Sequence, residues 1–275
     1  MNEKILKTKS NGFAALFSIL LLLILSVVGF ISSIALIRND GLQVVCILLS
    51  ILVFISSLVL FGGLKVVKPQ EAIVLTLFGE YTGSIKEPGF YFVNPFSVAV
   101  NPAAKTKLGQ SGDVDRQSTP VTISTTGGVE ANLNALKNQI SLKIMTLNNS
   151  RQKINDCLGN PVEIGIAVTW RVVDTAKAVF NVDNYKEYLS LQCDSALRNI
   201  VRIYPYDVAP NVDTTGDGIA DEGSLRGSSE VVAKRIRDEI QARVENAGLE
   251  IIEARITYLA YAPEIAAVML QRQQA

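Results

Sequence analysis

The residue types that most often carry catalysis are sparse in this chain. Its 275 residues include no histidine. That excludes serine–histidine–aspartate catalysis, cysteine–histidine catalysis and metal ligation by histidine. The three cysteines, Cys46, Cys157 and Cys193, are far apart in the sequence, so we expect neither a disulfide framework nor a paired-cysteine metal site. An enzyme built from this chain would need carboxylate, lysine or tyrosine chemistry, or a partner subunit.

One aspartate-rich stretch has the spacing of a calcium loop. Oxygen ligands would come from positions 1, 3, 5 and 9, with glycine at position 6: Asp213, Thr215, Asp217, Asp221 and Gly218. Position 12 is Ser224, however, where such a loop needs a bidentate glutamate. We therefore interpret the stretch as a solvated polar insertion and predict no metal site. A calcium-responsive membrane module built on Asp213–Asp221 stays as an alternative, which a calcium titration of the parent and of Asp217→Ala would test.

Other catalytic and nucleotide-binding motifs are incomplete or missing. Ser150 and Lys153 form an S-x-x-K, but the S-D-N and K-T-G motifs that accompany it in penicillin-recognising enzymes do not occur. Neither a P-loop nor a G-x-G-x-x-G is present. Basic and acidic residues balance at 26 each, so a nucleic-acid partner is not expected. We predict no catalytic residues and no cofactor, and keep a membrane-associated hydrolase only as an alternative.

Two long apolar runs near the start dominate the organisation of the chain. They extend from Phe13 to Ile37 and from Leu42 to Leu64, and neither contains a charged residue. Each is longer than the roughly 20 residues that a helix needs to cross the bilayer core. Only four residues, Arg38 to Gly41, separate them. Because backbone groups in lipid must be satisfied within the segment, we predict a transmembrane helical hairpin over 13–64.

Charges that flank the hairpin predict its orientation. Lysines lie before the first run and after the second: Lys4, Lys7, Lys9, Lys65 and Lys68. The turn between the runs carries Arg38 with Asp40 beside it. Since lysine and arginine accumulate on the cytoplasmic side of membranes, we expect both ends in the cytoplasm and the turn outside. Residues 1–12 then form a basic cytoplasmic tail of a protein that crosses the cell membrane twice.

The segment directly after the hairpin alternates strands and turns. Ala72 to Phe78 is β-branched and apolar, and Phe90 to Val93 is a second short strand. Pro69 is expected to end the second membrane helix or its continuation. Several residues here match a family pattern in order and spacing: Pro69, Glu71, Ala72, Phe78-Gly79, Pro88-Gly89 and Asn94-Pro95. In this arrangement the chain resembles the SPFH (band seven) family of stomatins, prohibitins, flotillins and the bacterial HflK and HflC proteins, as a membrane-anchored, bacterial-type member.

The sequence pattern of the second half of the chain predicts long strands with helices between them. Pro161 to Val173 alternates with period 2 and is a half-buried strand, whereas Gln139 to Leu147 is a weaker strand and Arg151 to Leu158 a loop or short helical turn. Asp174 and Asn184 are expected to begin two helices, and Pro205 to end the second. A helix with Val232, Ile236, Ile240 and Val244 on its buried face ends at Gly248. A strand follows, in which Ile252, Ala254, Ile256 and Tyr258 alternate with Glu253, Arg255 and Thr257.

Two groups of side chains are assigned to packing and to the surface. We expect the aromatic residues Trp170, Tyr185 and Tyr188 to pack in the core. Charged residues of the last long helix are expected on its solvated face, where they could pair with a neighbouring copy: Arg235, Arg237, Asp238, Glu239 and Arg243.

The helix–glycine–strand order also resembles the SPFH family. The resemblance implies an α+β fold over 65–260, with a β-rich first half and helices packed on a sheet in the second. Residues 261–275 then start a C-terminal helix. Family members usually continue into a long, often coiled-coil, helix, so we expect the chain to be cut short at Ala275. A longer parent reading frame would confirm this, and a native stop codon after Ala275 would refute it.

The resemblance also implies a function. Family members act as non-enzymatic, membrane-anchored scaffolds that assemble into rings or cages. These assemblies organise a membrane microdomain or regulate partner membrane proteins such as proteases. The expected partners are therefore the lipid bilayer, further copies of the chain, and a membrane protease or another membrane protein.

Overall fold

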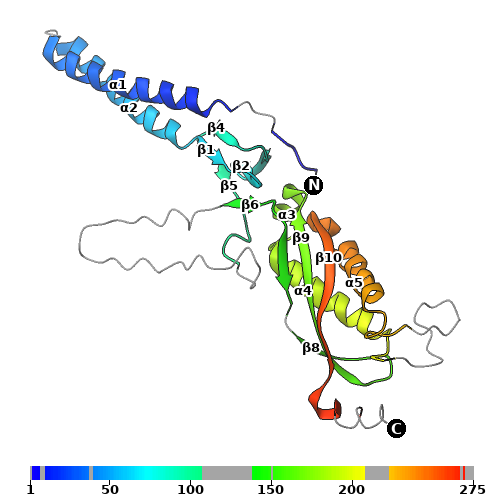
Figure 1. Cartoon of the computed structure of the whole chain (residues 1–275). Coiled ribbons are helices and arrows are strands. Elements are labelled where there is room, and N and C mark those ends of the chain that lie inside the picture. Colours follow the sequence, from blue (N-terminus) through cyan, green and yellow to red (C-terminus); the bar gives the residue numbers. More distant parts are fainter. Residues whose placement is uncertain are drawn as a thin grey trace. The chain divides into compact units, whose positions relative to one another are not determined.

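The computed structural model describes residues 2–6, 10–36, 40–106, 138–149, 151–207, 223–266 and 269. These residues fall into two compact units. The hairpin unit comprises Asn2–Asn101 with Asn138–Ser141, and the long-strand unit comprises the described residues from Pro102 to Thr106 and after Leu142. Figure 1 shows the elements of both.

The hairpin unit begins with two long helices that lie side by side, α1 (Gly12–Leu36) and α2 (Asp40–Phe61). Their boundaries confirm the predicted helical pair. At the contact between them, a Cβ on Gly29 would lie 3.1 Å from the Ser50 hydroxyl, so a glycine allows a close approach. Buried serine hydroxyls there donate to carbonyls of their own helix: Ser26 to Leu23, Ser33 to Gly29, and Ser57 to Phe54, at 2.6–2.7 Å. These local bonds satisfy polar groups that would otherwise be unpaired in an apolar surrounding.

The predicted end of the second helix is wrong. The helix stops at Phe61, well before Pro69. Gly62 and Gly63 form a turn, and Leu64–Val67 is a strand, β1. The apolar pattern of 42–64 could not reveal this end because it continues unbroken from helix into strand.

A small β-layer completes the hairpin unit. β1 pairs with β4 (Gly89–Phe92). β2 (Glu71–Leu77) pairs with β3 (Glu80–Ile85) on one edge and with β5 (Val98–Ala99) and β6 (Gln139–Ser141) on the other. Both strands predicted between residues 72 and 93 are confirmed. The core is small, with five members: Val67, Ile73, Leu75, Ile85 and Tyr91.

The long-strand unit is built on β9 (Pro161–Val172), which confirms the strongest strand prediction. Its five alternate apolar side chains are fully buried: Val162, Ile164, Ile166, Val168 and Trp170. β10 (Leu249–Tyr261) pairs with one edge of β9, and β7 (Met145–Asn148) and β8 (Gln152–Asn155) pair with the other. All three run antiparallel to β9.

Two predictions before β9 are wrong. The expected single strand from Gln139 to Leu147 is divided into β6 and β7, which belong to different sheets. The region from Arg151 to Leu158 contains the strand β8 rather than a loop or helical turn. A four-residue strand of polar sequence carries too little periodic signal to be recognised without its partner.

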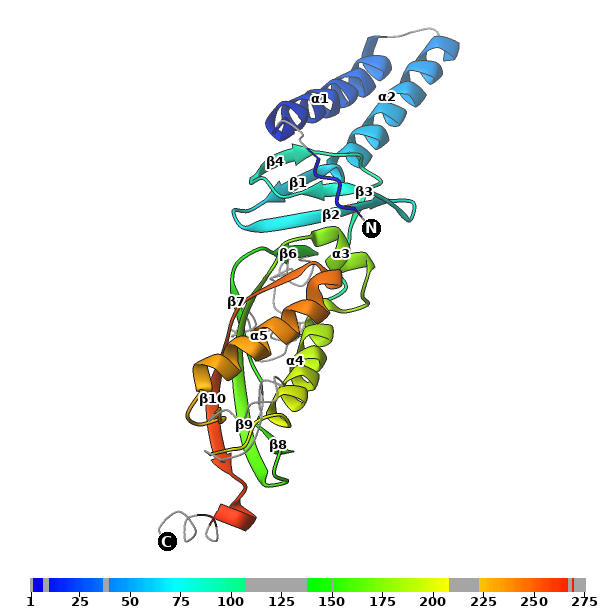
Figure 2. The ribbon, with the colours of Figure 1, turned by 90° about the vertical axis from the view of Figure 1, so that its right-hand side faces the viewer.

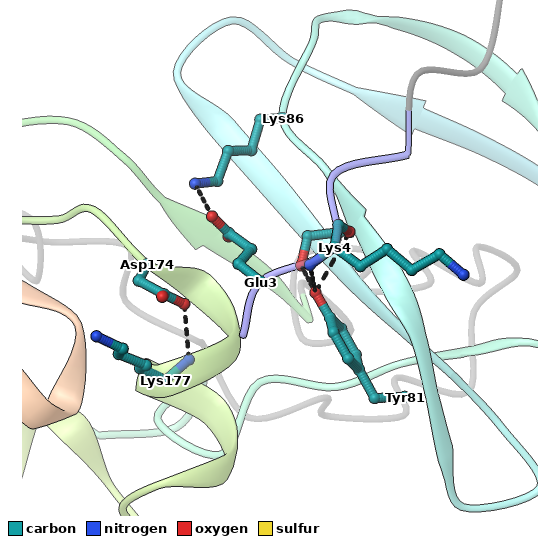
Figure 3. A network of polar contacts seen from close by, with 7 residues as sticks. Glu3, Lys4, Tyr81, Lys86, Asp174 and Lys177 are labelled. Carbon is teal, nitrogen blue, oxygen red and sulfur yellow. Dashed lines mark hydrogen bonds and ion pairs between the residues drawn. The ribbon is translucent and has the colours of Figure 1, made fainter. Parts of the chain in front are cut away.

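Helices of the long-strand unit cover one face of its sheet, as Figure 2 shows for α4 (Tyr185–Val201) and α5 (Ser229–Val244). The predicted caps of α3 (Thr175–Phe180) and α4 are confirmed: Asp174 accepts from the Lys177 backbone at 2.9 Å (Figure 3), and Asn184 accepts from Lys186 and Glu187. α4 ends at Val201, before Pro205. The predicted buried face of α5 is confirmed, and its charged residues are not simply solvated, since Arg243 bonds Glu239 and Ser195.

The predicted strand is confirmed as β10, but its regular alternation is interrupted near the start. Ile251 is buried, whereas Ile252 is 40% exposed and Ala254 points inward again. The register with β9 slips between Ile251 and Glu253. A bulge of this kind adds one residue and reverses which side chains face the core.

Trp170 gives a test of the core. Its ring is fully buried beside Tyr185, but its indole N–H has no partner among the described residues. We expect Trp170→Ala to lower the free energy of unfolding by about 3–5 kcal/mol through the cavity it leaves. Trp170→Phe should lower the free energy of unfolding by less than about 2 kcal/mol. It removes the indole N–H, and a buried donor without a partner itself costs about 1–3 kcal/mol. Urea unfolding followed by circular dichroism would compare them. Equal losses would mean that the N–H makes a stabilising bond.

Candidate functional site

The candidate catalytic and metal-binding residues lie mostly outside the described part of the chain. Asp213 to Asp221 and Ser150 lie outside the described residues. Lys153 lies on β8, where its Nζ contacts Glu264 Oε1 at 2.6 Å on an exposed surface. That hydrogen bond from Lys153 lowers the pKa of the Glu264 carboxyl. Lys153 is therefore a surface ion-pair partner.

The cysteines in the long-strand unit are not activated. Burial, with Asp194 beside it, raises the pKa of Cys193 to about 12. Partial burial, followed by the charge of Asp156, also raises the pKa of Cys157. Since the thiolate is the reactive form, neither thiol is poised as a nucleophile. Within the described ranges, no three His, Cys, Asp or Glu side chains are grouped as metal ligands.

The most unusual surface of the described chain is the apolar one of α1 and α2. Both helices are long and apolar enough to cross a membrane. Of the 18 most apolar consecutive residues in each helix, only 11% are buried in α1 and 6% in α2. A core helix of a soluble protein would be mostly buried, so the exposed apolar surface favours contact with lipid.

The entrance to α1 is tied to β4. The Asn11 side-chain oxygen accepts a hydrogen bond from the Phe92 backbone at 3.2 Å. Two residues further along, the Phe13 ring meets the Phe90 ring edge-on, with centroids 5.2 Å apart. The start of the first helix is therefore fixed to the β-layer by both a polar and an aromatic contact.

The exit from α2 is tied to the end of the same strand. Gly63 accepts a hydrogen bond from the Val93 backbone at 2.9 Å. A Cβ atom on Gly63 would lie 2.4 Å from the Val93 carbonyl oxygen, so only glycine allows this approach. Both bases of the hairpin thus lie against residues 90–93 of the β-layer.

The N-terminal tail adds a short parallel segment to the free edge of β3 (Figure 3). Ser84 donates to Lys4 at 2.8 Å, and the Leu6 backbone donates back to Ser84 at 2.9 Å. Glu3 and Lys86 form an ion pair at 2.6 Å, with side chains only 12% and 21% exposed. Leu6 packs against the small core. The segment before α1 and the strands after α2 therefore lie on the same side of the hairpin, as an even number of membrane crossings requires.

An exposed aromatic pair stands out on the β-layer. Phe78 is 85% exposed and Phe96 is 58% exposed, and their rings stack with centroids 6.2 Å apart. Phe78 and Gly79 form the two-residue turn between β2 and β3, and Phe78 has a left-handed φ of 51°. That conformation costs an L-residue other than glycine or asparagine about 1–2 kcal/mol. A strained, exposed phenylalanine does not stabilise the fold, which points to a contact outside the chain.

The loop that carries Phe96 also meets the base of α2. The Pro95 carbonyl lies in contact with Gly62, at 3.5 Å from the position of a Cβ. Phe96 directly follows Pro95, and Gly62 directly follows the last residue of α2. Phe96 therefore lies near the end of the second apolar helix. In the sequence, Phe78-Gly79 and Asn94-Pro95 mark strand ends and match the family pattern, but nothing there predicts an exposed aromatic pair. The available signal was a phenylalanine where a two-residue hairpin turn favours asparagine.

Comparison with known proteins agrees with this architecture. The family described as SPFH domain / Band 7 family matches residues 65–275. No curated protein matches the chain. The matched region begins within β1, directly after the helical pair, and includes the β-layer strands β2 to β6 and the long-strand unit. The chain therefore belongs to the SPFH domain / Band 7 family, with an α+β domain that follows two apolar helices long enough to span a membrane.

Proposed function

We propose that the protein is a non-enzymatic scaffold, anchored in the cell membrane by α1 and α2, that assembles into a large homo-oligomer. The observation that carries this proposal is the fixed base of the hairpin. A flexible linker would let the β-layer move freely, whereas contacts to residues 90–93 from both helices hold this layer in one orientation at the bilayer. Copies held in one orientation meet through the same surfaces, and confinement raises their effective concentration.

The membrane topology follows from charge. Lys4, Lys65 and Lys68 lie on the base side of the hairpin, and the connection between the helices has Arg38 beside Asp40. The excess of positive charge at the base favours the cytoplasm for the SPFH domain. Tags at residue 1 and at the C-terminus should both be digested by protease in inside-out vesicles and protected in right-side-out ones. Protection of one tag alone would contradict the two-pass arrangement.

The aromatic pair adds a second, shallower contact with the bilayer. Phe78 and Phe96 enter the interfacial region beside the base of α2, where aromatic side chains are favoured. Their burial in lipid offsets the strain at Phe78 and fixes the tilt of the β-layer. This assignment is supported by their exposure and by the contact between Pro95 and Gly62.

A tryptophan reporter tests that contact. We expect Phe78→Trp in a Trp170→Phe background to be strongly quenched in vesicles with brominated acyl chains, because quenching requires the ring to lie in the bilayer. The same variant in unbrominated vesicles is the control. Red-shifted, unquenched emission would show that Phe78 lies in water.

Phe78→Asn separates folding from membrane contact. Asparagine tolerates the left-handed conformation, so we expect stability in detergent to stay equal or to rise by up to about 1 kcal/mol. Thermal melts of the solubilised variant and parent would measure this. A marked loss of stability would mean that Phe78 supports the fold rather than an external contact.

Assembly and partner binding complete the proposal. Such an oligomer would form a ring or cage, organise the enclosed membrane and hold partner membrane proteins such as proteases. Light scattering of the chain in mild detergent, with the detergent mass subtracted, tests the assembly. A large, discrete mass is expected. A monomer from both this chain and any longer parent would refute the scaffold.

A further inference from the structure

The start of the outer edge of β10 is closed by side chains of α5. Gln241 accepts a hydrogen bond from the Ile251 backbone at 2.7 Å and donates to the Leu249 carbonyl at 3.2 Å. The side-chain amide thus imitates the peptide group of a neighbouring strand. Arg237 also donates to the Ile251 carbonyl at 3.3 Å. These bonds protect the start of an edge strand that would otherwise pair with other chains.

The next section of β10 lacks such protection. Among the described residues, no side chain of α5 bonds the backbone of Ile252–Ile256. Instead a groove of about 600 Å³ separates this section from the first half of α5, between Ser229 and Arg237. The groove is open along the strand, and its walls carry both charge signs, with Glu230 and Lys234 on the helix and Glu253 and Arg255 on the strand. An extended segment could enter and add a strand.

The opposite edge of the same sheet is complementary in length and direction. It consists of β7 and β8, each four residues long. The open section of β10 is also short, because register slips on either side leave Glu253–Ile256 as four regular residues. Since β7, β8 and β10 all run antiparallel to β9, they run in the same direction as one another.

We propose that the occupant of the groove is the β7–β8 edge of a second copy, which pairs in parallel with Glu253–Ile256. This inference rests on the proposed scaffold function and names its assembly surface. Copies anchored in one membrane share one topology, so neighbours related by a small rotation about the membrane normal have their strands in nearly the same direction. The contact uses two different surfaces, so each copy can bind a neighbour on either side, and the series closes into a ring when the rotation allows.

Cysteine pairs test the contact directly. Arg255 and Asn148 both pair with Ala167, so their side chains project from the same face of the sheet. Lys153 pairs with Glu163 and shares that face. Adjacent strands lie about 4.8 Å apart, which falls within the Cα separation of a disulfide, about 4.4–6.8 Å. In the full chain with Cys46→Ser and Cys157→Ser, we expect Arg255→Cys with Asn148→Cys or with Lys153→Cys to give a disulfide ladder. Cys193 stays because it is buried.

Single cysteine variants are the controls. Each alone should give no cross-linked product, because a head-to-tail contact brings residue 255 to residue 148 or 153 and never to itself. A dimer from Arg255→Cys alone would indicate a two-fold contact and overturn the head-to-tail arrangement.

A groove-filling variant provides the second measurement. Ala233 lines the groove, whereas Val231 lies on the same helix, is exposed and does not. We expect Ala233→Trp to lose the ladder and the large mass in light scattering, and Val231→Trp to keep both. A large oligomer that gives no ladder from either pair and survives Ala233→Trp would overturn this surface and leave the scaffold standing. A monomeric parent would instead refute the scaffold, and this surface with it.

Discussion

Arginine at the centre of both apolar helices is expected to abolish membrane insertion. Leu25 and Leu49 lie near the middle of α1 and α2 and are more than half exposed. A central arginine costs about 2.5–3.5 kcal/mol on insertion scales, so Leu25→Arg with Leu49→Arg adds about 5–7 kcal/mol, with the lost leucines further reducing the driving force. Most of the chain should then leave the carbonate-resistant membrane fraction.

The matched control keeps the positions and removes the charge. Leu25→Ala with Leu49→Ala should remain in the membrane fraction, because alanine is tolerated in a long apolar helix. If the arginine pair also stays in the membrane, lipid does not surround these two positions, and the hairpin is then covered by protein. If both variants leave the membrane fraction, the leucines themselves are needed for folding of the hairpin.

Replacement of Gly248 by alanine is expected to be the most destabilising small change in the long-strand unit. Gly248 has a left-handed φ of 69° and connects η2 (Glu245–Ala247) to β10. Its carbonyl accepts from both Val173 and Asp174, and a Cβ would lie 2.3 Å from the Asp174 carbonyl oxygen. Left-handed backbone costs an alanine about 1–2 kcal/mol, and the clash adds about 1–3 kcal/mol. We expect a loss of about 2–5 kcal/mol in the free energy of unfolding.

Gly159 is the control for this prediction. It also has a left-handed φ, 83°, but nothing lies within 4 Å of the position of its Cβ. Gly159→Ala should therefore lose only the conformational contribution, about 1–2 kcal/mol. The difference between the two variants in urea unfolding measures the close approach at Gly248. Equal losses would show that the chain relieves the clash by a small shift.

Elements with a long periodic signal could be predicted from the sequence. β9 alternates over twelve residues, and α5 repeats an apolar residue every fourth position, so each pattern matches only one kind of element. Asp174 and Asn184 were recognisable as caps because their side chains act on the backbone two or three residues later. The hairpin helices follow from apolar length alone.

Elements that depend on a distant partner could not be predicted. β8 is a strand because β9 offers an edge, and Ile252 is exposed because β10 slips against β9. The tail segment at Glu3–Leu6 pairs with β3 about eighty residues away. None of these has a local pattern, since the hydrogen bonds that create them are long-range.

The features proposed to carry function also fall into two groups, those that the sequence determines and those that depend on the tertiary structure. By itself the sequence determined that this chain has no histidine chemistry, has two helices able to span a membrane, and carries the motifs of its family, because these depend on residue type and local order. Only the tertiary structure decided that both helix bases lie against residues 90–93 and that the exposed rings of Phe78 and Phe96 stack. It alone also showed that, in the described part of the chain, α5 side chains bond the start of the β10 edge and not the backbone of Ile252–Ile256. Those features arise from which segments meet in space, and composition and periodicity do not encode such meetings.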